Sequence, residues 1–120
     1  MKTSFVAYNI LMLLGSSFHR SVYVRDAMSF LTGEVYIKTL PGKLYGIFKN
    51  LNNAEDFLDD MFIRLSKQEL IKFKKEKDRL CAEITKEGLK FIFELERDYL
   101  TEDKYKNFIG SLKHEKNCSL

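Results

Sequence analysis

A run of apolar residues near the N-terminus constrains this chain most, because a helix built from it has almost no polar side to turn toward water. The run extends from Phe5 to Leu14 and is interrupted by Asn9. It has about half the length that a membrane-spanning helix needs, and Gly15 supplies a helical stop. We therefore expect a buried helix over residues 4–14, and a dimer interface is one place where such a helix could be covered.

The chain of 120 residues has room for one domain with its own core. Apolar residues make up 45% and charged residues 31%, which is typical of a globular protein. We expect a core over about 4–100, a C-terminal helix over 101–114 and a flexible tail over 115–120. Cys81 and Cys118 do not form a disulfide framework, and we expect them to be reduced thiols in a cytoplasmic protein without a membrane partner.

Periodicity and capping signals predict further elements along the chain. The first half of the chain should form a helix over 22–31 capped by Ser21, a strand over 34–38, and a helix over 40–51 with Thr39 as N-cap and Pro41 in its first turn. The second half should form a strand over 61–65, a returning strand over 79–84, and a helix over 86–99 capped by Thr85. The buried side of this last helix should consist of Leu89, Ile92, Phe93 and Leu95. Residues 54–84 could instead form one or two helices, which would make the protein all-α.

The expected helix over 40–51 is the most informative element. Its apolar residues fall on one side at helical spacing. Its other side has no acid and no large apolar group, and it consists of Thr39, Gly42, Lys43, Gly46, Lys49, Asn50 and Asn53. Lys and Asn suit the phosphates and base edges of the DNA major groove. We interpret this segment as a DNA recognition helix, and the alternative is a plain amphipathic helix with a solvated face.

A second candidate contact is the lysine-rich stretch over 66–78, which lies between two candidate strands. A basic β-hairpin at this position would touch phosphates without reading sequence. The interleaved Glu69, Glu76 and Asp78 also allow a solvated helix or loop. The complete set of expected DNA-binding residues is Lys38, Thr39, Gly42, Lys43, Gly46, Lys49, Asn50, Lys72, Lys74, Lys75, Lys77 and Arg79.

The order of the expected elements is that of a winged helix-turn-helix domain. The apolar residues 8–14, followed by Pro-Gly-Lys-Leu-Tyr-Gly-Ile-Phe-Lys-Asn-Leu over 41–51, resemble the PadR-type winged-helix regulators. Ile-Thr-Lys-Glu-Gly-Leu over 84–89 resembles the L-T-x-x-G pattern that closes the wing in the PadR and MarR families. Residues 19–23 depart from the family's H-G-Y-E. The resemblance covers about residues 5–95 and implies an α+β, mostly helical fold with a small β-hairpin wing and an extra C-terminal helix.

We expect a homodimer that binds double-stranded DNA, with its dimer surface on the first and last helices and with transcriptional regulation as its role. One alternative is a centromere-binding adaptor of a plasmid or phage partition system, which shares this fold and would also recruit a filament-forming NTPase. Another is a small helical protein that binds a second protein, such as an immunity or inhibitor protein.

Catalysis finds no support in the sequence. His19 and His114 have no Cys or acidic neighbours at ligand spacing. The acids over 55–60 have neither His partners nor a glycine-rich phosphate loop beside them. We therefore expect no enzyme activity, no metal and no cofactor.

Overall fold

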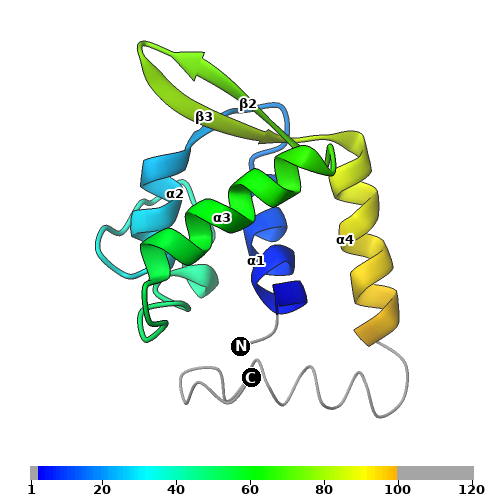
Figure 1. The fold of residues 1–120 in the computed structure, drawn as a ribbon, viewed down its shortest axis with the longest axis horizontal. Helices are drawn as coiled ribbons and strands as arrows, with labels where there is room; N and C mark the ends of the chain where they lie inside the picture. Colours follow the sequence, from blue (N-terminus) through cyan, green and yellow to red (C-terminus); the bar gives the residue numbers. More distant parts are fainter. Residues whose placement is uncertain (1–2, 100–120) are drawn as a thin grey trace.

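The computed structural model describes residues 3–99, which form an α+β domain with four α-helices and a three-stranded antiparallel sheet (Figure 1). The elements are α1 (Thr3–Gly15), β1 (Val22–Tyr23), α2 (Val24–Leu31), the 3-10 turn η1 (Gly42–Leu44), α3 (Ala54–Lys67), β2 (Ile71–Glu76), β3 (Arg79–Ile84) and α4 (Lys86–Tyr99). The expected helix over 101–114 and tail over 115–120 lie outside the described residues.

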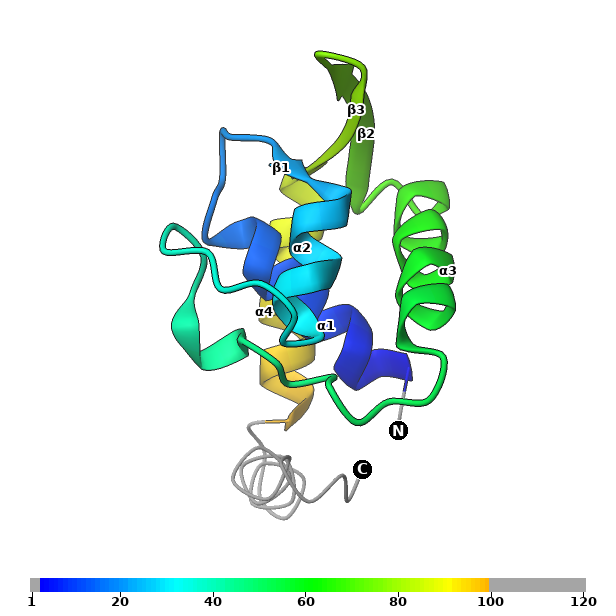
Figure 2. The same ribbon diagram turned by 90° about the vertical axis from the view of Figure 1, so that its left-hand side faces the viewer.

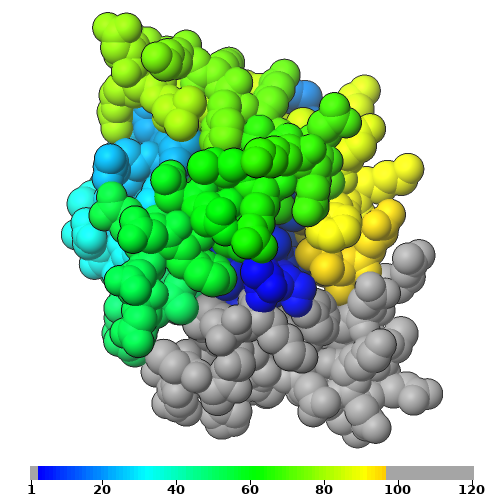
Figure 3. All heavy atoms as spheres, viewed as in Figure 1, coloured from blue at the N-terminus to red at the C-terminus, as the bar shows by residue number. Residues whose placement is uncertain are grey.

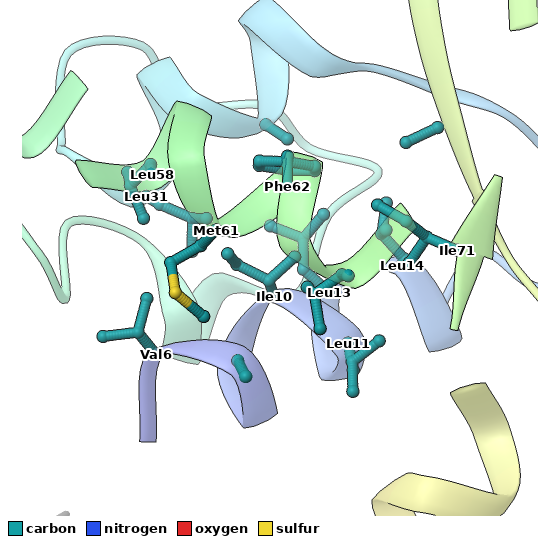
Figure 4. Packing of buried hydrophobic residues seen from close by; sticks show 14 of the residues in the cluster. Val6, Ile10, Leu11, Leu13, Leu14, Leu31, Leu58, Met61, Phe62 and Ile71 are labelled. Atoms are coloured by element: carbon teal, nitrogen blue, oxygen red, sulfur yellow. The ribbon is translucent and has the colours of Figure 1, made fainter. Parts of the chain in front are cut away.

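Helix α1 is the centre of the core, and the prediction of a buried first helix is confirmed. Nine of its thirteen residues are buried, and it contacts α3, α4 and β3. In Figure 4 the side chains of Val6, Ile10 and Leu13 point toward Met61 and Phe62 of α3. Burial of such side chains is the main stabilising contribution of the core, at about 1.5–3 kcal/mol each.

None of the helices in the part of the chain that the structure describes combines the length and the hydropathy that crossing a bilayer requires.

Strand β3 lies in the middle of the sheet, between the two-residue β1 and β2. The predicted returning strand over 79–84 is confirmed, and it pairs with β2 from Ile71↔Ile84 to Glu76↔Arg79. Alternation places Ile71, Ala82 and Ile84 on one face, where all three are buried. The β2–β3 hairpin rises from this buried base beyond the helices (Figures 1 and 2).

Helix α4 begins after Thr85, and the predicted cap is confirmed because Gly88 N–H donates to Thr85 Oγ1 over 3.0 Å. Gly88 lies directly against the Leu70 carbonyl, at the junction between α3 and β2. The expected buried side of this helix is wrong at one position. Ile92 is buried and Leu89 and Leu95 are partly buried, but Phe93 is 68% exposed.

The prediction of a helix over 40–51 is wrong. This segment is a series of tight turns, because the amide groups of Leu44, Ile47 and Leu51 donate to carbonyls three residues back. Two other amides bond to α2 instead, since Gly46 N–H donates to Phe30 O and Phe48 N–H donates to Leu31 O. Leu40, Leu44 and Phe48 are buried all the same. Apolar residues at a spacing of four therefore fill the core here without a helix.

Three smaller predictions are also wrong. Residues 34–38 form no strand, and they belong to the loop over 32–53 that joins α2 to α3. Residues 61–65 lie in α3, because Leu58, Met61, Phe62 and Leu65 make a buried helical stripe. Ser21 does not cap α2. Its hydroxyl donates to Glu83 Oε1 over 3.0 Å, and Val22 pairs with Ala82 in the sheet.

Candidate nucleic-acid interface

The structure separates the seven expected DNA-binding residues of the loop over 32–53. They share no helical face, because that helix does not form. Thr39 lines a hollow beside β1, Lys43 lines another beside α1, and Lys49 lines a third between α2 and the start of α3. Lys38, Gly42 and Asn50 are exposed as well. Isolated exposed groups of this kind do not make one surface that could enter a DNA groove.

Gly46 is buried and is not available to any ligand. Its φ of 69° lies in the left-handed region, and its backbone packs against that of Gly33, whose φ is 83°. A side chain at either position would strain the backbone. Glycine is therefore needed at 46 to bring the loop against α2, rather than to let a DNA backbone approach.

The five expected cations of the hairpin, in contrast, are brought together. Lys72, Lys74 and Lys75 lie in β2, Lys77 lies in the turn and Arg79 begins β3. All five are exposed. Strand alternation divides them, since Lys72, Lys74 and Arg79 share one face and Lys75 lies on the other. The hairpin is therefore cationic on both sides of its outer half.

Three of these cations already have carboxylate partners. Glu83 accepts from Lys74 over 3.0 Å and from Lys72 over 3.5 Å, and its side chain is 17% exposed. These lysines and the Ser21 hydroxyl hold the pKa of Glu83 below its usual value, with the Lys74 hydrogen bond as the largest cause. The same bond to Glu83 raises the pKa of Lys74. The base of the hairpin therefore carries several charged side chains, but its net charge is close to zero because its lysines are paired with glutamates.

Arg79 is also paired with a carboxylate, and it contacts an aromatic ring as well. Its guanidinium lies 3.7 Å from the centre of the Tyr23 ring and donates to Asp26 Oδ1 over 3.1 Å. A cation over an aromatic face is attracted to the ring's negative potential. The Cys81 thiol lies 3.8 Å from the Arg79 carbonyl oxygen, and burial raises the pKa of this thiol. Arg79 therefore joins the hairpin to α2 as well as carrying charge.

Lys75 and Lys77 differ from the other three cations, since neither forms a salt bridge within residues 3–99. Lys77 and Asp78 make the two-residue turn, with φ values of 52° and 63°. Positive φ at both positions is typical of a type I′ hairpin turn, which normally uses Asn and Gly. A residue with a Cβ costs about 1 kcal/mol there. The strained turn presents Lys77 at the point of the hairpin farthest from the core.

Helix α3 lies beside the hairpin and has the opposite charge. Its exposed side carries Glu55, Asp56, Asp59 and Asp60 in the first two turns, and Arg64 and Lys67 follow near its end. Arg25 pairs with Glu55 and Arg64 pairs with Asp60, both over 2.8 Å. A hollow between α2, α3 and the hairpin is lined by Arg25, Glu55, Asp56, Asp59 and Arg79. Figure 3 shows the surface of α3 crossing the front of the molecule below the hairpin.

Sequence reasoning gave a helix within residues 54–84 only as the alternative to a strand over 61–65, although the signal for α3 was present. Asn53 precedes two acids in a first turn, where the helix dipole favours negative charge. Leu58, Met61, Phe62 and Leu65 follow at helical spacing. Strand β2 was also missed, because the lysine-rich stretch was placed between two strands. Its signal is the alternation of Ile71 and Phe73 with lysines, which is typical of a half-buried strand.

Within the described residues no group of three or more His, Cys, Asp or Glu side chains is arranged to hold a metal ion. No family model, curated protein or solved structure matches the chain. The candidate interface therefore depends on the geometry and the charge of this chain alone.

Proposed function

We propose that this chain is a winged-helix protein that binds double-stranded DNA and that the β2–β3 hairpin, acting as the wing, is its main DNA contact. The element order α1–β1–α2–α3–β2–β3–α4 is the winged-helix order and supports this proposal. The observation that carries it is the projecting hairpin, with Lys75 and Lys77 exposed at its outer end. Unpaired lysines on a rigid projection neutralise phosphates and release counterions.

The acidic face of α3 modifies the usual mode of binding. In a helix-turn-helix domain the helix at this position enters the major groove. The first two turns of α3 would bring four carboxylates close to the phosphates, and like charges repel at this range. We therefore assign groove or phosphate contacts to the hairpin and to Arg64 and Lys67 at the end of α3, and none to its first two turns.

We propose a homodimer as the binding form, with α4 as the main dimer surface. Phe93 is 68% exposed on α4, while nine residues of α1 are already buried within the chain. A transcriptional regulator and a partition adaptor would use the same DNA surface. They differ in the partner, because an adaptor also binds a filament-forming NTPase, and a gene for such a protein beside this one would favour the second role.

The test is an electrophoretic mobility shift with 30-base-pair duplexes tiled across the DNA upstream of the chain's own gene, at 50 and 200 mM salt. We expect a shift that weakens with salt. Lys75→Glu with Lys77→Glu should reduce affinity by at least tenfold and lower the salt slope by about two. Lys38→Glu with Lys43→Glu makes the same charge change on exposed positions of the loop over 32–53, which has no proposed duplex contact, and should have little effect.

If the hairpin variant binds as tightly as the parent chain, the hairpin is not the DNA contact. If no duplex is retained at either salt concentration, the alternative of a protein-binding module is favoured. The four exposed carboxylates of α3 would then make a basic protein surface the natural partner.

A further inference from the structure

Two exposed aromatic rings lie on the loop over 32–53, away from the hairpin. Tyr36 is 57% exposed and Tyr45 is 38% exposed, and their ring centres are 5.2 Å apart at an interplanar angle of 78°. Both rings rest on Phe30 of α2, at 5.8 and 5.3 Å, and Phe30 is fully buried. In Figure 2 the first part of this loop lies on the opposite side of α2 from α3.

The loop holds these rings in place through its backbone. Tyr45 Oη donates to Gly33 O over 2.8 Å, and Gly46 N–H donates to Phe30 O over 2.9 Å. Position 42 is glycine, and a Cβ there would lie 3.4 Å from Tyr36 Oη. Large aromatic side chains are normally buried, because burial of each is favourable by about 1.5–3 kcal/mol. Here Tyr45 is held at the surface by its hydroxyl, and Tyr36 packs against it with more than half of its area open.

The charge around the rings is positive. From residue 35 to residue 54 the chain has three lysines and no acid. Lys43 follows Gly42, where a Cβ would meet the Tyr36 hydroxyl. The stem of Lys49 lies near Gly33, whose carbonyl accepts from the Tyr45 hydroxyl. Lys38 is two residues after Tyr36 and is exposed. Glu34, at the start of the loop, is the one carboxylate among residues 32–53.

We infer that Tyr36 and Tyr45 form a stacking platform for an unpaired base, and that the loop is a binding site for single-stranded nucleic acid. Single-strand sites combine aromatic rings, on which bases stack, with cations that follow the phosphates. Lys38, Lys43 and Lys49, which were all expected to contact DNA, would here contact the phosphates at separate points along the strand. This site is separate from the proposed duplex contact and does not depend on it.

The experiment measures binding of fluorescein-labelled dT12 by fluorescence anisotropy, with an abasic 12-mer of the same phosphate number as the comparison. We expect the parent chain to bind dT12 about tenfold more tightly than the abasic strand. Tyr36→Leu should weaken dT12 binding about tenfold and leave abasic binding unchanged. Tyr36→Phe keeps the ring and should stay within twofold of the parent chain.

Ile63→Ala is the matched control, because it removes an exposed apolar side chain from α3, away from the loop, and should leave both affinities unchanged. Lys75→Glu with Lys77→Glu should weaken duplex binding at least tenfold and keep the preference for dT12 over the abasic strand, so failures of the two proposals are distinguishable. Equal binding of dT12 and the abasic strand would overturn the inference. Equal dT12 binding by the Tyr36→Leu variant and the parent chain would also overturn it. A third contradicting result would be that the chain binds an acidic peptide but no dT12, and that this binding depends on Tyr36.

Discussion

The β2–β3 hairpin and α3 are neighbours that use the same amphipathic principle with opposite charge. Each buries one side, Ile71 and Ala82 in the hairpin and Met61 and Phe62 in the helix. The exposed charged residues of β2 are mostly lysines. All exposed charged residues in the first half of α3 are acidic. In the proposed complex with duplex DNA, element order alone would make α3 the reading helix. Charge instead favours the hairpin for that contact, and the difference between the two regions can be tested.

The largest effect should come from the junction that holds the two regions together. Gly88→Ala would place a Cβ against the Leu70 carbonyl, which is backbone and cannot rotate away. Glycine to alanine normally stabilises a helix by up to 1 kcal/mol. Here we expect a loss of about 3 kcal/mol from overpacking, measured by chemical denaturation. The exposed Lys90→Ala on the same helix is the control, and an equally stable Gly88→Ala variant would mean that the hairpin is not anchored there.

A smaller effect should follow from neutralising α3. Asp56→Asn with Asp59→Asn removes two exposed carboxylates beside the hollow that separates α3 from the hairpin. If DNA lies against the hairpin, these charges are close enough to repel it, and duplex affinity should rise about threefold, or about 0.6 kcal/mol. Glu87→Gln with Glu94→Gln makes the same charge change on exposed positions of α4. A decrease in affinity would show that α3 contributes to binding through its acids.

The turn of the hairpin allows charge and strain to be separated. Asp78→Gly and Lys77→Gly each remove a side chain from a left-handed position, and each should stabilise the fold by about 0.5–1 kcal/mol. Only Lys77→Gly would also remove a proposed phosphate contact. We therefore expect duplex affinity to fall for Lys77→Gly and to rise slightly for Asp78→Gly. Equal affinities of the two variants would exclude Lys77 as a contact.

The smallest effect concerns Glu83. Its pKa is lowered in the folded chain, so its contribution to stability is present above the usual glutamate pKa and is lost as the pH falls through the lowered value. Glu83→Gln should cost less than about 1 kcal/mol at neutral pH, and the difference from the parent chain should vanish in acid. Release of Lys72 and Lys74 should steepen the salt dependence of duplex binding. A difference in thermal stability that persists in acid would contradict this account.

Some parts of the molecule could be predicted from the sequence because local signals and tertiary packing agree. Residues 5–14 form a buried helix because their composition allows no other place for them. Thr85 caps α4 because its hydroxyl meets the amide of the residue three positions on. The returning strand over 79–84 places Ala82 and Ile84 at alternate positions that face the core.

The sequence by itself determined a central apolar helix and a lysine-rich segment beside an acidic one. Only the tertiary structure decided which of the segments with helical spacing became a helix. Residues 40–51 and 54–67 both place apolar side chains at intervals of three and four, but Gly46 and Phe48 bond to the end of α2, and this pairing replaces the helical hydrogen bonds. Apolar periodicity therefore predicts which side chains are buried. It does not predict the hydrogen-bond partner of a backbone amide, because that partner can belong to a residue far away in the chain.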